Sequence, residues 1–195
     1  MCGRFFIAEE DTAEDLRRII DALNRRYNGR SPARTQGELR PADIIPVVAN
    51  TPALAPGAFA MKWGYTMPDG KPMFNARSET AATRPLFADG MKQRRCLIPA
   101  TLYFEWEKRG TQRIKHAIFP TGSDMLYIAG IYRIEGNRAA CSILTRAPAA
   151  CIAHIHDRMP VILPREAVAD WLNLRYNPQE VLTASMEIMT FQPCN

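Results

Sequence analysis

The chain has 195 residues, with 25 Lys and Arg against 20 Asp and Glu, a formal net charge of +5 and a hydrophobic fraction of 47%. This length and composition are typical of a soluble globular protein built as one domain, which we place at residues 1–195. No apolar run approaches the ~20 residues that cross a membrane, and the early charges at Glu9 and Glu10 are unlike a signal peptide. We therefore expect a cytoplasmic protein without a membrane partner.

The five cysteines are scattered and form no CxxC pair: they are Cys2, Cys96, Cys141, Cys151 and Cys194. The three histidines are not spaced with cysteines as zinc ligands are, so the sequence predicts neither a structural metal nor disulfides. Arginine accounts for 20 of the 25 basic residues, and its planar fork of donors suits phosphate groups. This balance favours a nucleic-acid partner, although many basic proteins simply carry solvated arginines.

The N-terminal part of the chain is predicted to form strands and one helix. Residues 2–7 have the pattern of a first strand. Apolar residues at 16, 19, 20 and 23 then recur at helical spacing, and Asp11 with Glu14 resembles a capping box, so we expect an amphipathic helix from Asp11. Residues 28–43 are rich in Gly, Pro and polar residues and are predicted to form a long loop. Two strands follow, at 44–50 and 58–63.

Strand patterns dominate the rest of the chain. Residues 96–106 are predicted to form one long, kinked strand, from which a hairpin leads to a second strand at 114–119. Further strands are expected at 126–134, 140–145 and 186–191, with helical segments after Pro148, at 165–174 and at 178–185. Because strands predominate without regular alternation with helices, the predicted fold class is α+β, with a largely antiparallel, barrel-like twisted sheet and peripheral helices.

Cys2 has distinctive chemistry if the initiator Met is removed. It would then carry a free α-amine and a thiol, whose reference pKa values are ~7.7–8 and ~8.5. Such a 1,2-aminothiol reacts with an aldehyde, because the amine forms an imine and the sulfur then closes a five-membered thiazolidine. The alternative is an ordinary buried cysteine in the first strand, and this stretch alone does not decide between them.

Three further stretches set polar groups among apolar ones: NARSET (75–80), YFEW (103–106) and HDRMP (156–160). Glu105 lies between aromatic residues, so it either faces solvent or is buried with a raised pKa that suits proton transfer near pH 7. His156 is the right type for a general acid or base, although a hydrogen-bonded loop histidine is commoner. Asn75 would orient an amine or carbonyl group, or serve only as a turn residue.

Five short motifs occur in order along the chain: MCGRF (1–5), MKWGY (61–65), NARSET, RRCLIPA (94–100) with the downstream EW, and IHDRMPVIL (155–163). Together they resemble the SOS response-associated peptidase (SRAP) family, from residue 2 to residue 172. The resemblance implies a twisted, barrel-like β-structure with a positively charged DNA-binding face. It also implies covalent capture of abasic sites in single-stranded DNA in the DNA damage response, where the N-terminal Cys closes a thiazolidine on the aldehyde of the ring-opened sugar.

By motif position, the resemblance implies that Cys2 is the nucleophile and cross-linking residue. Asn75 would hold the amine or the opened sugar, and Glu105 and His156 would handle protons. Glu105 is also implicated in self-removal of Met1, and His156 in ring opening and imine formation, while cleavage through the imine would make the protein a lyase.

The resemblance also implies a DNA-binding set, with arginines for phosphates and two apolar residues that support or stack against splayed bases. The set is Arg4, Arg77, Arg84, Arg158, Trp63 and Pro99. A core role for Trp63 is an open alternative. We expect no cofactor and no metal, a monomer by analogy with the family module, and association with the nucleoid when DNA is bound.

One departure from the expected pattern lies before the EW dipeptide. The family pattern there is Gly-aromatic-Tyr, whereas this chain has Leu102-Tyr103-Phe104, so Phe104 lacks the expected hydroxyl. Two alternative functions also remain open: a thiol peptidase acting in trans, with His156 as base for Cys2, and a non-catalytic module that binds single-stranded DNA.

Overall fold

The computed structural model describes residues 2–9 and 13–194. Its centre is a small barrel, in which hydrogen-bonded pairs close a ring of five strands in the order β12–β4–β3–β8–β11. All neighbours in the ring are antiparallel except β12 and β4, which are parallel. The bounds are β3 (Ile44–Asn50), β4 (Pro56–Trp63), β8 (Arg95–Ala100), β11 (Leu126–Glu135) and β12 (Arg138–Arg146). The predicted α+β class with a largely antiparallel, barrel-like sheet is confirmed.

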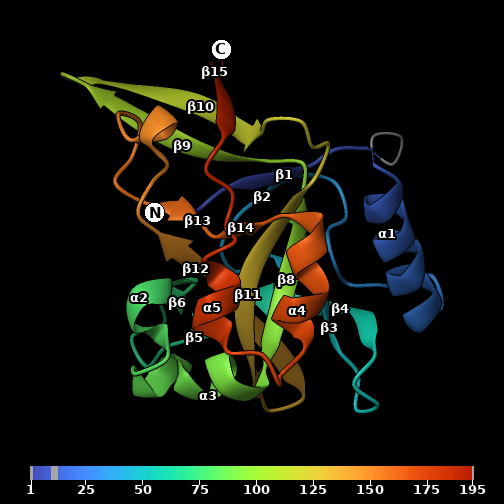
Figure 1. Cartoon of the computed structure of the whole chain (residues 1–195). Helices are drawn as coiled ribbons and strands as arrows, with labels where there is room; N and C mark the ends of the chain where they lie inside the picture. The colour runs from blue at the N-terminus through green and yellow to red at the C-terminus, as the bar shows by residue number, and fades with distance from the viewer. Residues whose placement is uncertain (1, 10–12, 195) are drawn as a thin grey trace.

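A second antiparallel sheet lies above the barrel in Figure 1, and its long β9–β10 hairpin extends to one side. Its strands, in spatial order, are β15 (Met189–Pro193), β10 (Gln112–Pro120), β9 (Leu102–Arg109), β1 (Phe5–Ile7) and β2 (Gly37–Leu39). Three short strands, β7 (Asn75–Arg77), β13 (Met159–Pro160) and β14 (Ile162–Leu163), extend the barrel sheet. Strands β5 (Tyr65–Thr66) and β6 (Pro72–Met73) form a separate two-stranded sheet.

The helices surround the barrel, as Figure 1 shows. They are α1 (Glu14–Arg26), α2 (Ser78–Ala81), α3 (Pro85–Gln93), α4 (Val168–Leu172) and α5 (Pro178–Leu182), with 3₁₀ turns η1 (Ala150–Ile152) and η2 (Arg165–Ala167). Helix α1 buries Leu16, Ile20 and Leu23, which is the stripe that its spacing predicts. No helix within the described ranges is long and apolar enough to cross a membrane.

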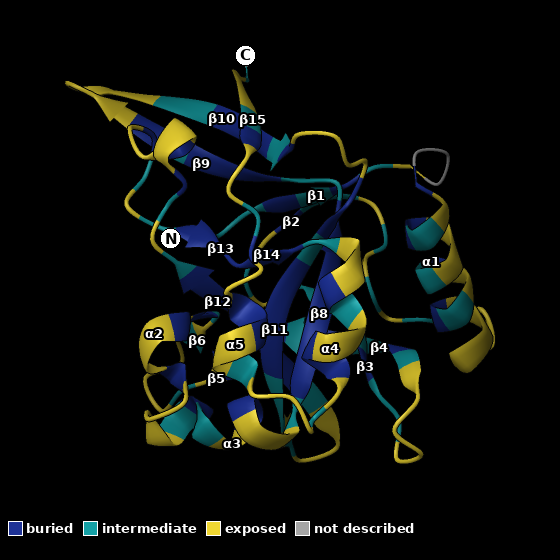
Figure 2. Ribbon diagram, viewed as in Figure 1, coloured by how far each residue is buried: buried dark blue, intermediate teal, exposed yellow. Residues whose placement is uncertain are grey.

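Burial is concentrated in the barrel strands, which are mostly dark blue in Figure 2. Every residue of β8 is buried, as expected for a strand covered on both faces. Trp171 of α4 packs against this strand and donates a hydrogen bond from Nε1 to the Cys96 carbonyl at 2.8 Å. The side chain thus satisfies its one donor while its ring fills the core.

The predicted single strand at 96–106 is two strands in two different sheets. Strand β8 ends at Ala100 in the barrel, and β9 begins at Leu102 in the second sheet. Thr101 forms the bend, with its N–H bonded to the Phe6 carbonyl at 2.8 Å and its hydroxyl accepting from the Ala8 N–H at 2.9 Å. The first strand of the chain therefore fixes the point at which the chain crosses between sheets.

Smaller differences fall at the ends of the predicted elements. The long loop at 28–43 contains strand β2, which pairs with β1. The helix predicted at 165–174 is a 3₁₀ turn followed by α4, and the helix predicted at 178–185 ends at Leu182. Asp11 of the predicted capping box lies outside the described residues.

Candidate functional site

The candidate site is organised by one face of β9. Tyr103, Glu105 and Glu107 alternate along this strand and are all buried, with exposed fractions of 0%, 3% and 7%. Alternate residues of a strand point to the same side of the sheet, so the three polar side chains share one face. Strand β1 pairs with the start of β9, and the Phe104 N–H bonds to the Arg4 carbonyl at 2.9 Å. This pairing brings Cys2, just before β1, to the polar face.

Cys2 is fully buried and is held by an asparagine from another part of the chain. Asn75 Nδ2 donates a hydrogen bond to the Cys2 carbonyl at 3.0 Å. Asn75 is placed by β7, which pairs with β12, and by Phe74, whose carbonyl accepts from Trp63 Nε1 at 3.1 Å. Asn75 Oδ1 is buried and has no hydrogen-bond partner among the described residues, so it can accept a further donor at Cys2.

Glu105 and His156 form the acid–base part of the site. Glu105 Oε2 lies 3.9 Å from His156 Nε2. Burial raises the pKa of Glu105 to about 7, because the apolar surroundings disfavour the charged carboxylate. Burial also lowers the pKa of His156. Near neutral pH, Glu105 is therefore close to half protonated beside a mainly neutral imidazole, an arrangement that allows proton exchange.

The other ring nitrogen of His156 has two competing partners. Nδ1 accepts a hydrogen bond from the Arg158 N–H at 3.0 Å and lies 2.8 Å from Asp157 Oδ1. The first contact requires an unprotonated Nδ1, whereas a hydrogen bond to the carboxylate requires a protonated one. The loop therefore offers partners for both protonation states of the ring.

The Cys2 thiol is protonated in this environment. Burial raises its pKa above the ordinary range, with the Glu105 carboxylate as a further cause. Its only hydrogen bond among the described residues is a long one, 3.9 Å, to the Arg4 carbonyl. A thiol in such a place needs a nearby base to become nucleophilic, and Glu105 is the neighbouring carboxylate.

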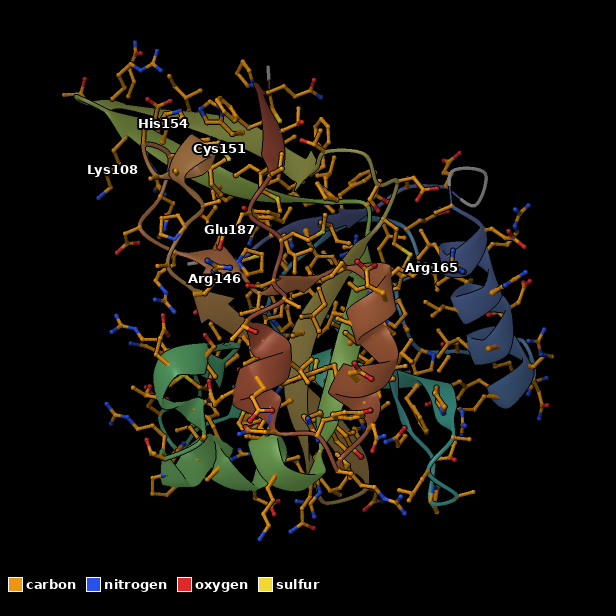
Figure 3. All side chains as sticks on the ribbon, viewed as in Figure 1. Lys108, Arg146, Cys151, His154, Arg165 and Glu187 are labelled. Atoms are coloured by element: carbon orange, nitrogen blue, oxygen red, sulfur yellow. The ribbon has the colours of Figure 1, made fainter. Side chains whose placement is uncertain are left out.

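The structure thus brings together the four predicted catalytic residues, Cys2, Asn75, Glu105 and His156, from four separate segments of the chain. The loop that carries His156 follows η1, and Figure 3 shows Cys151 and His154 of this segment beside the β9–β10 hairpin. In that view Lys108 projects outward from the hairpin.

The predicted DNA-binding arginines differ in their surroundings. Arg77 and Arg84 are exposed just before α2 and α3. Arg4 pairs with Glu38 at 3.0 Å. The Arg158 guanidinium binds Glu79 through both terminal nitrogens, at 2.7 and 2.8 Å. A phosphate would therefore compete with a carboxylate at Arg4 and Arg158, whereas Arg77 and Arg84 form no ion pair within 4 Å among the described residues.

The two predicted base-contacting residues both lie in the core. Trp63 is 0% exposed and contacts Phe5 and Phe74, with ring centroids 4.9 and 6.0 Å apart. Pro99 is buried in β8, opposite Tyr127 of β11. Contact with DNA bases stays a prediction for both residues, and in this structure they support the barrel.

Sequence reasoning did not include three polar residues near the site: Tyr103, Glu107 and His116. His116 pairs with Glu105 in the β9–β10 ladder, and its Nε2 lies 2.9 Å from Glu107 Oε2. The spacing of two residues on either side of Glu105 would have identified Tyr103 and Glu107, because it places them on the same face of the strand.

The fold and the site define an α+β protein in which an N-terminal cysteine is held beside a buried carboxyl group. The sequence model of one family, "SOS response associated peptidase (SRAP)", matches residues 1–193. The chain belongs to this family.

Curated relatives carry names that state a role. Abasic site processing protein YobE of Bacillus subtilis is 37% identical over 125 residues, which cover 58% of this chain and 57% of that protein. Abasic site processing protein YoqW of the same organism is 33% identical over 139 residues, covering 65% and 62%. Abasic site processing protein HMCES of Xenopus tropicalis is 28% identical over 171 residues, covering 69% and 51%. The matches span less than two thirds of the length of each relative.

Solved structures share the fold at low identity. A protein from Bacteroides thetaiotaomicron superposes with a TM-score of 0.81 at 20% identity, covering 100% of this chain and 92% of that one. A phage-related protein from Bordetella bronchiseptica gives a TM-score of 0.75 at 21% identity, covering 99% and 94%.

Proposed function

We propose that this protein captures abasic sites in single-stranded DNA by forming a thiazolidine between Cys2 and the ring-opened sugar, and thereby shields the lesion. The observation that carries the proposal is the convergence of Asn75, Glu105 and His156 on the N-terminal cysteine. The names of the curated relatives, abasic site processing proteins, support the same substrate.

The reaction begins with removal of Met1, because the Cys2 nitrogen is otherwise part of a peptide bond. The proposal includes self-removal of Met1 with Glu105 as the proton carrier. The freed amine then adds to the aldehyde carbon of the opened sugar and gives a carbinolamine. Loss of the carbinolamine hydroxyl as water, with a proton supplied by an acid, gives the imine. Glu105, with a pKa of about 7, is suited both to give this proton and to take one back.

The thiol closes the ring in the last step. The Cys2 sulfur adds to the imine carbon, its proton passes to a base, and the imine nitrogen gains a proton, so that one water is lost overall. Because burial keeps the thiol protonated, this step needs the Glu105 carboxylate as acceptor. His156, 3.9 Å from Glu105, assists ring opening of the sugar. Elimination of the 3′ phosphate from the imine before ring closure would give lyase activity.

The proposed DNA contacts are made by exposed, positively charged side chains. Arg77 and Arg84 are exposed and form no ion pair within 4 Å among the described residues, and the chain carries a net charge of +5. Electrostatic contacts of this kind bind DNA without regard to sequence, which suits a lesion that lacks a base.

Intact-mass spectrometry tests the proposal directly. The Met1-free protein is mixed with a single-stranded oligonucleotide that contains one abasic site, and with the same oligonucleotide lacking the lesion. We expect a mass increase equal to the oligonucleotide minus one water, only with the lesion and without added reductant. Cys2→Ala should abolish this adduct, whereas Cys151→Ala, at an exposed cysteine, should retain it.

Three results would overturn the proposal. An adduct that survives denaturation in Cys2→Ala would show that Cys2 is not the cross-linking residue. Absence of an adduct in the Met1-free protein, together with cleavage of unrelated peptides, would favour a thiol peptidase acting in trans. Absence of both activities with retained affinity for single-stranded DNA would favour a non-catalytic binding module.

A further inference from the structure

Tyr103 has a buried hydroxyl group without a hydrogen-bond partner. Its side chain is 0% exposed, and no hydrogen bond to its hydroxyl oxygen exists among the described residues. Buried tyrosine hydroxyls normally find a partner, because an unsatisfied one keeps the full cost of its removal from water. A Phe at this position would give a more stable fold, unless the hydroxyl forms a hydrogen bond when another molecule is bound.

The hydroxyl belongs to the candidate site. Tyr103 precedes Glu105 by two residues and shares its face of β9. The Cys2 thiol and the Glu105 carboxyl are both close enough to influence the phenol electrostatically. Burial raises the pKa of Tyr103 well above its ordinary value, so the phenol keeps its proton and remains a hydrogen-bond donor.

The neighbouring Phe104 faces the other side of the strand. Lys115 Nζ lies 3.8 Å from the centre of its ring, and the Phe6 ring packs edge-on at 6.5 Å. A hydroxyl at position 104 would therefore point away from Cys2. The one aromatic hydroxyl of the YFEW stretch (103–106) is thus on the face where Cys2 reacts.

We propose that the Tyr103 hydroxyl donates a hydrogen bond to the aldehyde oxygen of the opened sugar when the Cys2 amine attacks. This inference rests on the proposed function. As the amine adds, the carbonyl oxygen gains negative charge, accepts a proton to become the carbinolamine hydroxyl, and finally leaves as water. A donor already fixed at that oxygen stabilises the developing charge without reorganising water. Tyr103 supplies that donor, while Glu105 moves the protons.

The unpartnered state of the free protein gives the proposal a distinctive signature. Tyr103→Phe removes an oxygen that makes no hydrogen bond among the described residues, so the variant should not be less stable than the parent. It should nevertheless form the adduct about 100- to 1000-fold more slowly, because removal of one such donor has effects of this order in other active sites.

Tyr127→Phe provides a matched control. The Tyr127 hydroxyl is bonded to the Asp15 carboxylate of helix α1, and neither residue belongs to the catalytic set. Its removal deletes a hydrogen bond that exists in the free protein. We therefore expect a lower Tm and an unchanged rate of adduct formation, which is the reverse of the result for Tyr103→Phe.

The experiment follows three quantities in the Met1-free parent and both variants. They are the single-turnover rate of adduct formation with the abasic oligonucleotide, the Kd for the same oligonucleotide without the lesion, and the Tm. A slower rate for Tyr103→Phe with unchanged Kd and an unchanged or higher Tm supports the proposal. An unchanged rate overturns it, and so does a slower rate accompanied by a lower Tm, because that pair indicates a structural role. Failure of the parent to form any adduct would instead overturn the proposed function on which the inference depends.

Discussion

The raised pKa of Glu105 has a direct consequence for stability. The carboxyl titrates near 7 in the folded protein, against an ordinary value of 4.5. The folded state therefore holds a proton that the unfolded state has released between these two pH values. Since stability falls with pH wherever the native state binds more protons, Glu105 should destabilise the protein progressively as the pH rises from 4.5 to 7, and by a constant amount above that.

The size of the effect follows from the difference between the two pKa values. A difference of about 2.5, obtained as 7 minus 4.5, corresponds to about 3 kcal/mol at 1.36 kcal/mol for each pKa unit. Glu105→Gln keeps the shape and the polarity of the side chain but cannot ionise. Its advantage over the parent should therefore grow by up to about 3 kcal/mol between pH 4.5 and pH 7.

Urea unfolding of both proteins at several pH values between 4 and 8 measures this difference. Carboxylates with a lowered pKa, such as Glu38 and Glu79, contribute with the opposite sign. They are present in both proteins and cancel in the comparison. A difference in unfolding free energy that stays constant from pH 4.5 to pH 7 would show that Glu105 titrates normally and would remove the basis for its proton-carrying role.

Two further predictions concern the support of Cys2 and the contacts to DNA. Asn75→Ala removes the bond to the Cys2 carbonyl and leaves that buried acceptor unpaired, so we expect the free energy of unfolding in urea to fall by about 1–3 kcal/mol. The control Asn137→Ala, in an exposed turn, should change stability little. Equal stabilities of the two variants would contradict the assigned bond. If Arg77 and Arg84 each contact one phosphate, Arg77→Gln and Arg84→Gln should each reduce the slope of log K against log salt for single-stranded DNA by about 0.7. Fluorescence anisotropy at salt concentrations from about 50 to 200 mM measures this slope. An unchanged slope would show that the substituted arginine does not contact the DNA.

The sequence predicted the strands better than their assembly. The strand predicted at 44–50 coincides with β3, and the strands predicted at 126–134 and 140–145 lie within β11 and β12. These segments are predictable because local patterning follows from burial on a sheet. The division of 96–106 between two sheets was missed because an apolar run has the same appearance whether it continues in one sheet or bends into another.

The candidate site shows the same contrast. Short motifs identified Cys2, Asn75, Glu105 and His156, and the structure brings them together. The flanking aromatic residues could not decide whether Glu105 is buried. Phe104 and Trp106 point to the opposite face of the strand from Glu105, so they do not show whether other elements cover the face of Glu105. Its burial depends on β1, β10 and the loop before β13, all distant in the sequence.

The sequence by itself determined the strand-rich class, the basic charge, the SRAP motifs and the chemical types available at Cys2, since these depend only on composition, order and local spacing. The tertiary structure alone decided that the Cys2 thiol is buried and protonated, that Glu105 titrates near 7, that Arg158 is paired with Glu79, and that Tyr103 carries its hydroxyl on the reactive face. The physical reason is that pKa values, ion pairs and unsatisfied hydrogen bonds depend on groups that are close in space. Those groups come from segments that are far apart in the chain.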